Sequence, residues 1–495
     1  DDTVPSLDRA LIAMNKFGKL SESEVTTPVN VAAKMLRLIP DSCFEELVKG
    51  ERRILDLASK AGEFAIAICE RCRQLGIPAE AVRGSVWSIP TSSVAYEFTR
   101  KMYQILGLST ETIAGKFHAY DLLNVVTADG KVDYKKIAGM LSQRKALSGI
   151  ALDEGENGEG NKMLFNAVVG NPPYQESDGG AQASARALYP YFVNIARELA
   201  PDYVSVIIPT RWFAGGKHLD SFRTSMLNDV HIKELHDCLH PEEIFPDTNN
   251  RGGICYFLWD ARYDNQRSGT RVVTHEAQGR YIVADRPLKT RDLDIFIRNS
   301  KALSILDKVI PDESTDVMSA HISPRRPFAL DGNFTKSPEF YASSEDALVP
   351  IKCYGKARTV GYVERDLIKA HTEWIDRWKV YMPYANNIGT ELNDDNQNTF
   401  IGEPESVCTE TFLMAGHDLY LNEKMCRHLA DYLRTKFARF LLSLAKISQH
   451  GTAKTYRFVP VQDFREEWTD ERLYAKYGLT EEEIAYIEKS IKRMD

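Results

Sequence analysis

Short apolar runs alternate with amphipathic stretches over the first half of the chain, from about Thr27 to Asp260. The apolar runs are typical of buried β-strands, and the stretches between them repeat apolar residues at helical spacing. Strands alternating with helices form a mainly parallel sheet covered on both faces, so the sequence predicts an α/β, Rossmann-like domain. We expect its strands at 53–57, 85–89, 117–120, 165–169 and 203–208, and helices at 29–36, through about 74, and at 96–106.

The alternation stops beyond Asp260, and short strands then surround helices. Residues 419–447 read as one long helix or two close ones. Because 495 residues are too many for one core, we expect several domains. The predicted division is an N-terminal extension at 1–25, an α/β domain at 26–262 and a mixed α+β region at 263–495.

The net charge of −8 means that the molecule as a whole repels nucleic acid, so any such surface has to be a local basic patch. One stretch, 434–457, is basic and has no acidic residue. Its alternative interpretation is a helix with one cationic face toward solvent. The candidates for phosphate contacts there are Lys446, Lys454 and Arg457.

The eight cysteines form no disulfide framework, which suits a reducing cytosol. The close pair Cys69 and Cys72 lies in a helical pattern without a second pair, so we predict no metal site. No apolar run approaches the ~20 residues of a membrane span and no signal peptide opens the chain, so we expect a cytoplasmic protein. Because the first residue is Asp1 rather than Met, we expect a piece of a longer protein.

The segment 171–174, Asn-Pro-Pro-Tyr, directly follows the strand predicted at 165–169. Ligands of parallel sheets bind beyond the carboxyl ends of the strands, which is where this segment lies. Successive prolines fix φ and leave rigid carbonyl groups. The Asn171 side-chain oxygen and the Pro172 carbonyl can accept both hydrogens of an aromatic exocyclic amine and so expose its lone pair, while Tyr174 offers a flat face to the ring.

With these residues the chain resembles the gamma group of amino-methyltransferases, the TaqI-like N6-adenine DNA methyltransferases of restriction–modification systems. The resemblance covers roughly 20–260 and is fainter through the C-terminal part. It implies a methyltransferase catalytic domain followed by a DNA target-recognition region, with S-adenosylmethionine as the cofactor. The implied catalytic residues are Asn171, Pro172, Pro173 and Tyr174.

The same resemblance implies a cofactor site, to which Asn171 also contributes. Thr27 and Pro28 match the N-terminal cofactor motif, although an N-cap followed by a first-turn proline explains them structurally too. The segment 54–64 matches the next motif but departs from it at two positions, Leu57 and Lys60. The residues carried over from these two motifs are Thr27, Pro28, Asp56, Ala58 and Gly62.

The carboxylate that the family uses for the cofactor ribose is absent near Pro90. Asp121 and Leu122 match the motif that accepts from the cofactor adenine, with a helix cap as the alternative. Phe257 takes the place of the aromatic residue that packs on the extruded base; Tyr256 is the fallback, and core packing is the alternative for Phe257.

These features predict a site-specific DNA adenine N6-methyltransferase that acts on a flipped base, bacterial or phage-encoded and nucleoid-associated. Expected partners are double-stranded DNA and, beyond it, restriction or helicase subunits or domains of a larger protein. Two alternatives stay open. One is a DNA-recognition subunit whose methylation is subordinate or lost, and the other is an RNA or protein N-methyltransferase.

Overall fold

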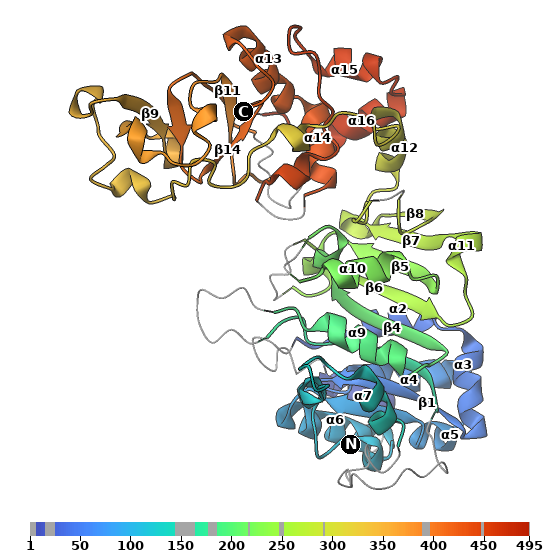
Figure 1. The fold of residues 1–495 in the computed structure, drawn as a ribbon. Coiled ribbons are helices and arrows are strands. Elements are labelled where there is room, and N and C mark those ends of the chain that lie inside the picture. Colours follow the sequence, from blue (N-terminus) through green and yellow to red (C-terminus); the bar gives the residue numbers. More distant parts are fainter. Residues whose placement is uncertain are drawn as a thin grey trace. The chain divides into compact units, whose positions relative to one another are not determined.

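The structure is a computed structural model that describes residues 6–14, 25–143, 164–176, 186–215, 218–246, 252–290, 293–388, 397–446 and 450–494. The chain forms two compact units (Figure 1). The first comprises Asp1–Trp212 and Gly216–Phe296, and the second comprises Phe213–Gly215 and Ile297–Asp495.

An eight-stranded sheet in the order β2-β1-β3-β4-β6-β5-β7-β8 organises the first unit. Within the described residues, β6 and β8 run against the other six strands, which are mutually parallel. The strands are β1 (Arg52–Ser59), β2 (Val86–Pro90), β3 (Leu164–Gly170), β4 (Tyr203–Pro209), β5 (Ile232–Cys238), β6 (Ile254–Asp260), β7 (Thr270–His275) and β8 (Tyr281–Arg286). The predicted α/β fold with a mainly parallel sheet is therefore confirmed.

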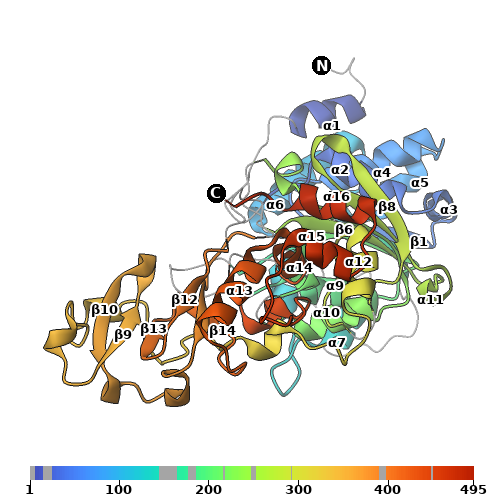
Figure 2. The same cartoon turned by 90° about the horizontal axis from the view of Figure 1, so that it is seen from above.

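Helices cover both faces of this sheet. Figure 2 shows α2, α4 and α5 on one side and α7, α9 and α10 on the other, and the strand residues that point to the first side pack into one apolar cluster with α2 and α4. The helix α1 packs on α4 and α6. The helices are α1 (Ser6–Met14), α2 (Val29–Arg37), α3 (Asp41–Glu45), α4 (Glu63–Gln74), α5 (Ala79–Arg83), α6 (Ser93–Leu106), α7 (Tyr134–Leu141), α9 (Tyr189–Glu198), α10 (Asp220–Leu227) and α11 (Asn265–Ser268).

One predicted strand, at 117–120, is wrong. That segment leads into a 3-10 helix, η3 (Ala119–Asn124), and only the single parallel bridge between Ser88 and Ile113 brings this part of the described chain alongside β2. The physical reason is local: Asp121 Oδ2 accepts from the His118 backbone N–H at 2.7 Å, which favours a turn over an extended ladder.

The sheet continues beyond the domain boundary expected after residue 262. Both β7 and β8 follow that position and pair with the sheet, and the first unit extends to Phe296. The expected boundary therefore falls inside this unit.

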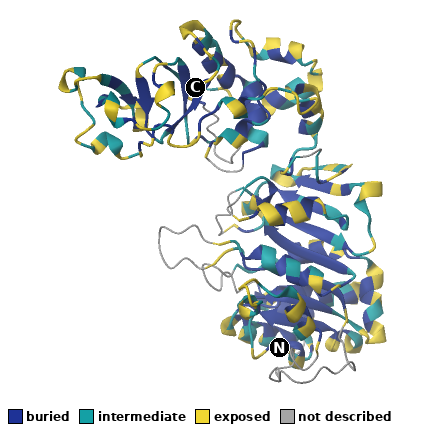
Figure 3. Ribbon diagram, viewed as in Figure 1, coloured by how far each residue is buried: buried dark blue, intermediate teal, exposed yellow. Residues whose placement is uncertain are grey.

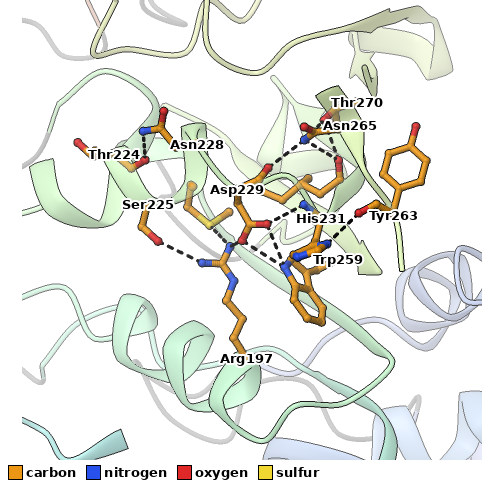
Figure 4. A network of polar contacts seen from close by, with 12 residues as sticks. Arg197, Thr224, Ser225, Asn228, Asp229, His231, Trp259, Tyr263, Asn265 and Thr270 are labelled. Atoms are coloured by element: carbon orange, nitrogen blue, oxygen red, sulfur yellow. Dashed lines mark hydrogen bonds and ion pairs between the residues drawn. The ribbon is translucent and has the colours of Figure 1, made fainter. Parts of the chain in front are cut away.

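A polar network fixes the edge of the sheet where β4 and β5 begin (Figure 4). Asp229, just before β5, accepts from Arg197 Nη2 of α9 at 2.9 Å and from Trp259 Nε1 of β6 at 3.1 Å. It also accepts from the His231 backbone N–H at 2.8 Å. The network ties a helix, a loop and a strand together at the end of the sheet opposite the carboxyl ends of β1 and β3.

The second unit contains two three-stranded sheets, in the orders β10-β9-β13 and β12-β11-β14, and five α-helices among its described residues. Its helices are exposed on one side (Figure 3), and its strands are buried to different degrees, from the fully buried β13 and β14 to β10, which begins with an exposed residue. The strands are β9 (Pro350–Tyr354), β10 (Val360–Glu364), β11 (Lys379–Pro383), β12 (Phe400–Gly402), β13 (Ser406–Cys408) and β14 (Phe412–Ala415). The helices are α12 (Lys301–Val309), α13 (Glu423–Arg434), α14 (Lys436–Leu444), α15 (Asp470–Lys476) and α16 (Glu481–Ser490).

Of the two forms expected for 419–447, the structure has two close helices, α13 and α14. Among the described residues, none of the helices has the length and apolar character that crossing a bilayer requires.

Candidate active site

The loops after β1 and β3 meet at the carboxyl edge of the sheet, because these two strands are parallel neighbours. Gly170, the last residue of β3, has a φ of +151°, and a Cβ there would lie 3.2 Å from Asp56 Oδ1. Gly62 has a φ of +83° and is the N-cap of α4. A side chain at Gly170 would push into the β1 carboxylate, so glycine is what allows the two loops to approach.

Two buried carboxylates flank the loop after β1, Asp56 within the strand and Glu63 at the start of α4. Asp56 is fully buried, and its Oδ1 accepts from the Ala58 backbone N–H at 3.3 Å. Burial raises the pKa of Asp56 well above its usual range, and the neighbouring carboxylate of Glu63 raises it further. Glu63, the first residue of α4, accepts from the Ala61 N–H at 2.9 Å and from the Thr27 N–H at 3.2 Å.

The segment that precedes α2 closes over this loop. The Val25 carbonyl accepts from Lys60 Nζ at 2.8 Å and lies 3.4 Å from Asn171 Nδ2. Thr27 is buried. The N-cap of α2 is Pro28, and no side chain caps this helix by a hydrogen bond. The alternative that Thr27 is the N-cap is therefore wrong by one residue. These contacts bring two of the cofactor motifs, at 27–28 and 54–64, together with the Asn171 loop.

The 171–174 loop itself is rigidly held. Asn171, Pro172 and Pro173 are buried, and the Tyr174 carbonyl accepts from the Leu188 N–H at 3.0 Å. Burial raises the pKa of Tyr174 well above its ordinary value, and the nearby thiol groups of Cys255 and Cys238 raise it further.

Several buried polar atoms around this edge have no hydrogen-bond partner among the described residues. Buried polar groups in folded proteins are nearly always paired, so these atoms are candidates for contacts with a polar ligand. The atoms are Thr27 Oγ1, Asp56 Oδ2, Asn171 Oδ1 and the Tyr174 hydroxyl.

Asp121 and Leu122 lie apart from these residues, in η3. Asp121 is exposed and one of its carboxylate oxygens is engaged as the helix cap, which supports the structural alternative for that oxygen. The His118 ring lies 3.1 Å from the Ser93 hydroxyl, which places η3 beside the first turn of α6, after β2. Leu122 is buried.

Phe257 lies inside the sheet. It pairs with Val206, which pairs with Gly170, so Phe257 lies in the row of Gly170 and is fully buried. The next rows toward the carboxyl edge hold Tyr256 and Cys255, because β6 is antiparallel to its neighbours. The structure therefore supports core packing for Phe257, and the stacking role predicted for it stays a prediction.

The basic stretch at 434–457 contains both buried and exposed cations, and Lys446 is one of the buried ones. Its side chain is 3% exposed and its Nζ donates to the carbonyl oxygens of Asn386 and Ile388 at 2.6 and 3.0 Å. Lys446 is therefore a structural residue with its donors turned inward, and the prediction that it contacts phosphate is wrong. Lys454 is exposed and Arg457 is half-buried, so both stay predictions.

Two residues of the site were not selected from the sequence. Glu63 joins Ala61 and Thr27, and Lys60, noted only as a departure from the family pattern, is tied to Val25. An acidic residue in the first turn of a helix is a local signal that makes Glu63 recognisable. The Lys60 contact spans 35 positions and has no local signal.

Comparison with known proteins agrees with this arrangement. Residues 86–245 match the Eco57I restriction-modification methylase family, a stretch that begins in β2 and includes the 171–174 loop. Over 107 residues, the chain is 34% identical to a protein of Mycoplasma pneumoniae described as an uncharacterized adenine-specific methylase. That stretch is 21% of this chain and 25% of that protein, so the chain matches about a quarter of this curated relative.

Solved structures with the same kind of description are similar at low identity. A nuclease-deletion mutant of the Type ISP restriction-modification enzyme LlaGI is 9% identical, with 94% of this chain and 46% of that chain covered and a TM-score of 0.49. A type I restriction-modification methyltransferase subunit from Streptococcus thermophilus is 16% identical, with 55% and 53% covered and a TM-score of 0.34. The match to the restriction-modification methylase family confirms the resemblance to restriction–modification methyltransferases, while the gamma-group assignment stays a prediction.

Proposed function

We propose that this chain is a site-specific DNA methyltransferase that transfers a methyl group from S-adenosylmethionine to the N6 amino group of a flipped adenine. We place it in a restriction–modification or phage-defence system, with the first unit, which extends to Phe296, as the catalytic part and the second unit as the target-recognition region. The family match and the adenine-specific description of the Mycoplasma relative support this proposal.

The observation that carries the proposal is the position of Asn171. It follows β3 at the carboxyl edge of a parallel sheet, and its Oδ1 is buried without a partner among the described residues. An unpaired amide oxygen beside a rigid Pro172 carbonyl is suited to accepting both hydrogens of an exocyclic amine. That arrangement favours a pyramidal nitrogen with an available lone pair.

The described residues fit the proposed cofactor. Asp56 Oδ2 and Thr27 Oγ1, which have no partner among the described residues, offer acceptors for an amino acid ammonium and hydroxyl groups. When bound, S-adenosylmethionine supplies a methyl group already activated by positive sulfur. In this proposal Asp56 and Thr27 hold the methionine part, and Asp121 with Leu122 faces the adenine part.

The chain itself then supplies position and orientation. A base inside a duplex cannot reach the 171–174 loop, so the adenine leaves the stack, which costs a few kcal/mol. The Tyr174 ring recovers part of that cost by stacking, and Asn171 with the Pro172 carbonyl orients N6. Because the transfer is a single displacement, proximity and orientation account for most of the acceleration.

A second candidate is a DNA-recognition subunit with subordinate or lost methylation. It is favoured by Lys60, which is 3% exposed and occupies the loop position where the resembled family has a small residue. It is also favoured by the absence of a carboxylate at the end of β2, where Thr91 and Ser92 follow Pro90. In this second case the chain would bind the cofactor weakly or without turnover.

Three measurements on the whole chain test these proposals. Titration with S-adenosylhomocysteine reports cofactor binding, radiolabelled methyl transfer to unmethylated genomic DNA reports turnover, and single-molecule sequencing of that DNA identifies the modified base. We expect transfer to adenine that Asn171→Ala abolishes. Transfer that survives in Asn171→Ala refutes the catalytic assignment. Cofactor binding without methyl transfer supports the recognition subunit. Methyl transfer only to RNA or protein means that DNA is not the substrate.

A further inference from the structure

A basic groove of about 650 Å³ lies in the second unit. Its walls are the turn between β9 and β10 and the segment that follows β11. The residues that decide its chemistry are Arg325, Lys356, Arg358, Tyr384, Asn398 and Glu410. Three cations line it against one carboxylate, although the whole chain carries a net charge of −8.

The two arginines are held in place before any ligand binds. Arg325 pairs with Glu410 at 3.0 Å and its guanidinium lies 4.7 Å from the Tyr384 ring centroid, while 54% of its side chain stays exposed. Arg358 donates to the Asn398 carbonyl at 3.1 Å and lies 4.9 Å from the Phe400 ring centroid. Such contacts lower the ordering cost of using a guanidinium to bind an anion.

The turn between β9 and β10 is strained in a way that keeps Arg358 at its tip. Ala357 and Arg358 have φ values of +56° and +57°, and the Gly355 N–H donates to the Thr359 carbonyl at 2.8 Å. Turns with a positive φ at both central residues favour Asn-Gly, because a Cβ is strained in that backbone conformation. Strained residues that carry an exposed cation are typical of binding sites.

The groove continues toward the basic segment that the sequence singled out. The His450 ring stacks on Tyr384 at 4.8 Å, and the Gly451 N–H donates to the Tyr384 carbonyl at 2.7 Å. Exposed Lys454 follows three residues later. In this unit the β10-β9-β13 sheet lies at the end away from α12 and α16 (Figure 2).

We propose that this groove binds the backbone phosphates of duplex DNA, with Arg325, Lys356 and Arg358 as the contacts. The inference rests on the proposed function, which supplies DNA as the substrate. A two-stranded β-ribbon has a width that the major groove of DNA admits, so the β9–β10 tip can enter beside a backbone that the three cations neutralise. Glu410 is already paired with Arg325, so it repels the phosphates less than an unpaired carboxylate would.

Fluorescence anisotropy tests whether the groove binds duplex DNA. It uses the full chain and a labelled duplex of about 30 base pairs over a range of salt concentrations. The variant Lys356→Gln/Arg358→Gln is expected to bind at least ~10-fold more weakly, with a slope of log K against log salt smaller by about 2. The control Lys424→Gln/Arg427→Gln removes the same charge from exposed positions of α13 and is expected to bind like the wild type.

A second variant, Arg358→Gly, separates binding from folding. Glycine relieves the positive φ, so we expect thermal stability to hold or rise while duplex affinity falls and the salt slope decreases by about 1. Wild-type duplex affinity in both groove variants overturns the inference and leaves the proposed function intact. A wild-type chain that binds cofactor but no duplex overturns both, and equal affinity for single-stranded RNA overturns the duplex assignment.

Discussion

Lys60 donates from its buried ammonium group to the Val25 carbonyl oxygen, 2.8 Å away. The same carbonyl lies 3.4 Å from Asn171 Nδ2. The contact therefore joins the segment before α2 to the β1 loop at the point where the Asn171 amide lies. A buried cation that is bound to a carbonyl is expensive to lose, because the buried carbonyl then loses a charged donor.

Replacing Lys60 by Met keeps the length of the side chain and removes its donor. We expect a loss of about 1–3 kcal/mol of unfolding free energy and weaker binding of S-adenosylhomocysteine, measured by denaturant titration and calorimetry. Lys101→Met removes the same charge from an exposed position of α6 and is expected to change neither quantity. Equal behaviour of the two variants would show that the Val25 contact has no role.

Gly170→Ala tests the close approach of β3 to the β1 loop. The new methyl group would lie 3.2 Å from Asp56 Oδ1, on a backbone with a φ of +151°. We expect a loss of about 1–3 kcal/mol in stability, together with loss of methyl transfer. Gly84→Ala is the matched control, because a Cβ there meets nothing within 4 Å; if both substitutions have the same effect, the approach of the two loops is not the cause.

Local signals explain what the sequence predicts well. The apolar runs of β1 and β3 and the prolines after Asn171 are contiguous in the chain, so their place at the carboxyl edge follows from strand order alone. The strand expected at 117–120 fails because a side-chain cap from Asp121, which is local too, competes with the ladder. Secondary-structure propensity alone cannot decide between a strand and a capped turn at 117–120, because the outcome depends on whether a neighbouring strand pairs with the segment.

Contacts between distant positions explain the features that the sequence does not predict. The acceptors of Lys446 are carbonyl oxygens 60 and 58 positions away, so its cation looks free in the sequence although the fold buries it. The groove cations Arg325 and Arg358 come from separate segments that only the second unit brings together. A basic surface assembled in this way has no run of lysines or arginines to mark it.

The raised pKa of Asp56 gives cofactor binding a pH dependence. Burial and Glu63 favour the protonated carboxyl, whereas a ligand ammonium favours the ionised one. Binding therefore releases a proton, and the affinity for S-adenosylhomocysteine should rise with pH, by roughly tenfold per unit at most, until the raised pKa is passed. Calorimetry between acidic and neutral pH measures this, and Asp56→Asn should bind weakly with a flat profile.

The same shift has a consequence for the ligand-free protein. Because the folded-state pKa of Asp56 lies above its unfolded value, its contribution to stability is fully present below the unfolded pKa and is lost as pH rises through the folded one. We therefore expect Asp56→Asn to be more stable than the wild type at neutral pH without ligand, and to lose that advantage in acid. An advantage that persists unchanged in acid would contradict the raised pKa.

The Tyr174 hydroxyl and the Tyr174 ring can be tested separately. The hydroxyl is buried without a partner among the described residues, so Tyr174→Phe removes a costly group and should leave stability equal or higher and kcat/KM within about twofold. Tyr174→Ala removes the ring that we propose stacks on the flipped base, and stacking is worth roughly 1–3 kcal/mol, so kcat/KM should fall by about 5- to 150-fold. Tritium transfer to DNA measures both, with S-adenosylhomocysteine affinity as the control for an intact cofactor site. If Phe is as damaging as Ala, the hydroxyl acts in the reaction and the ring is not the part that matters.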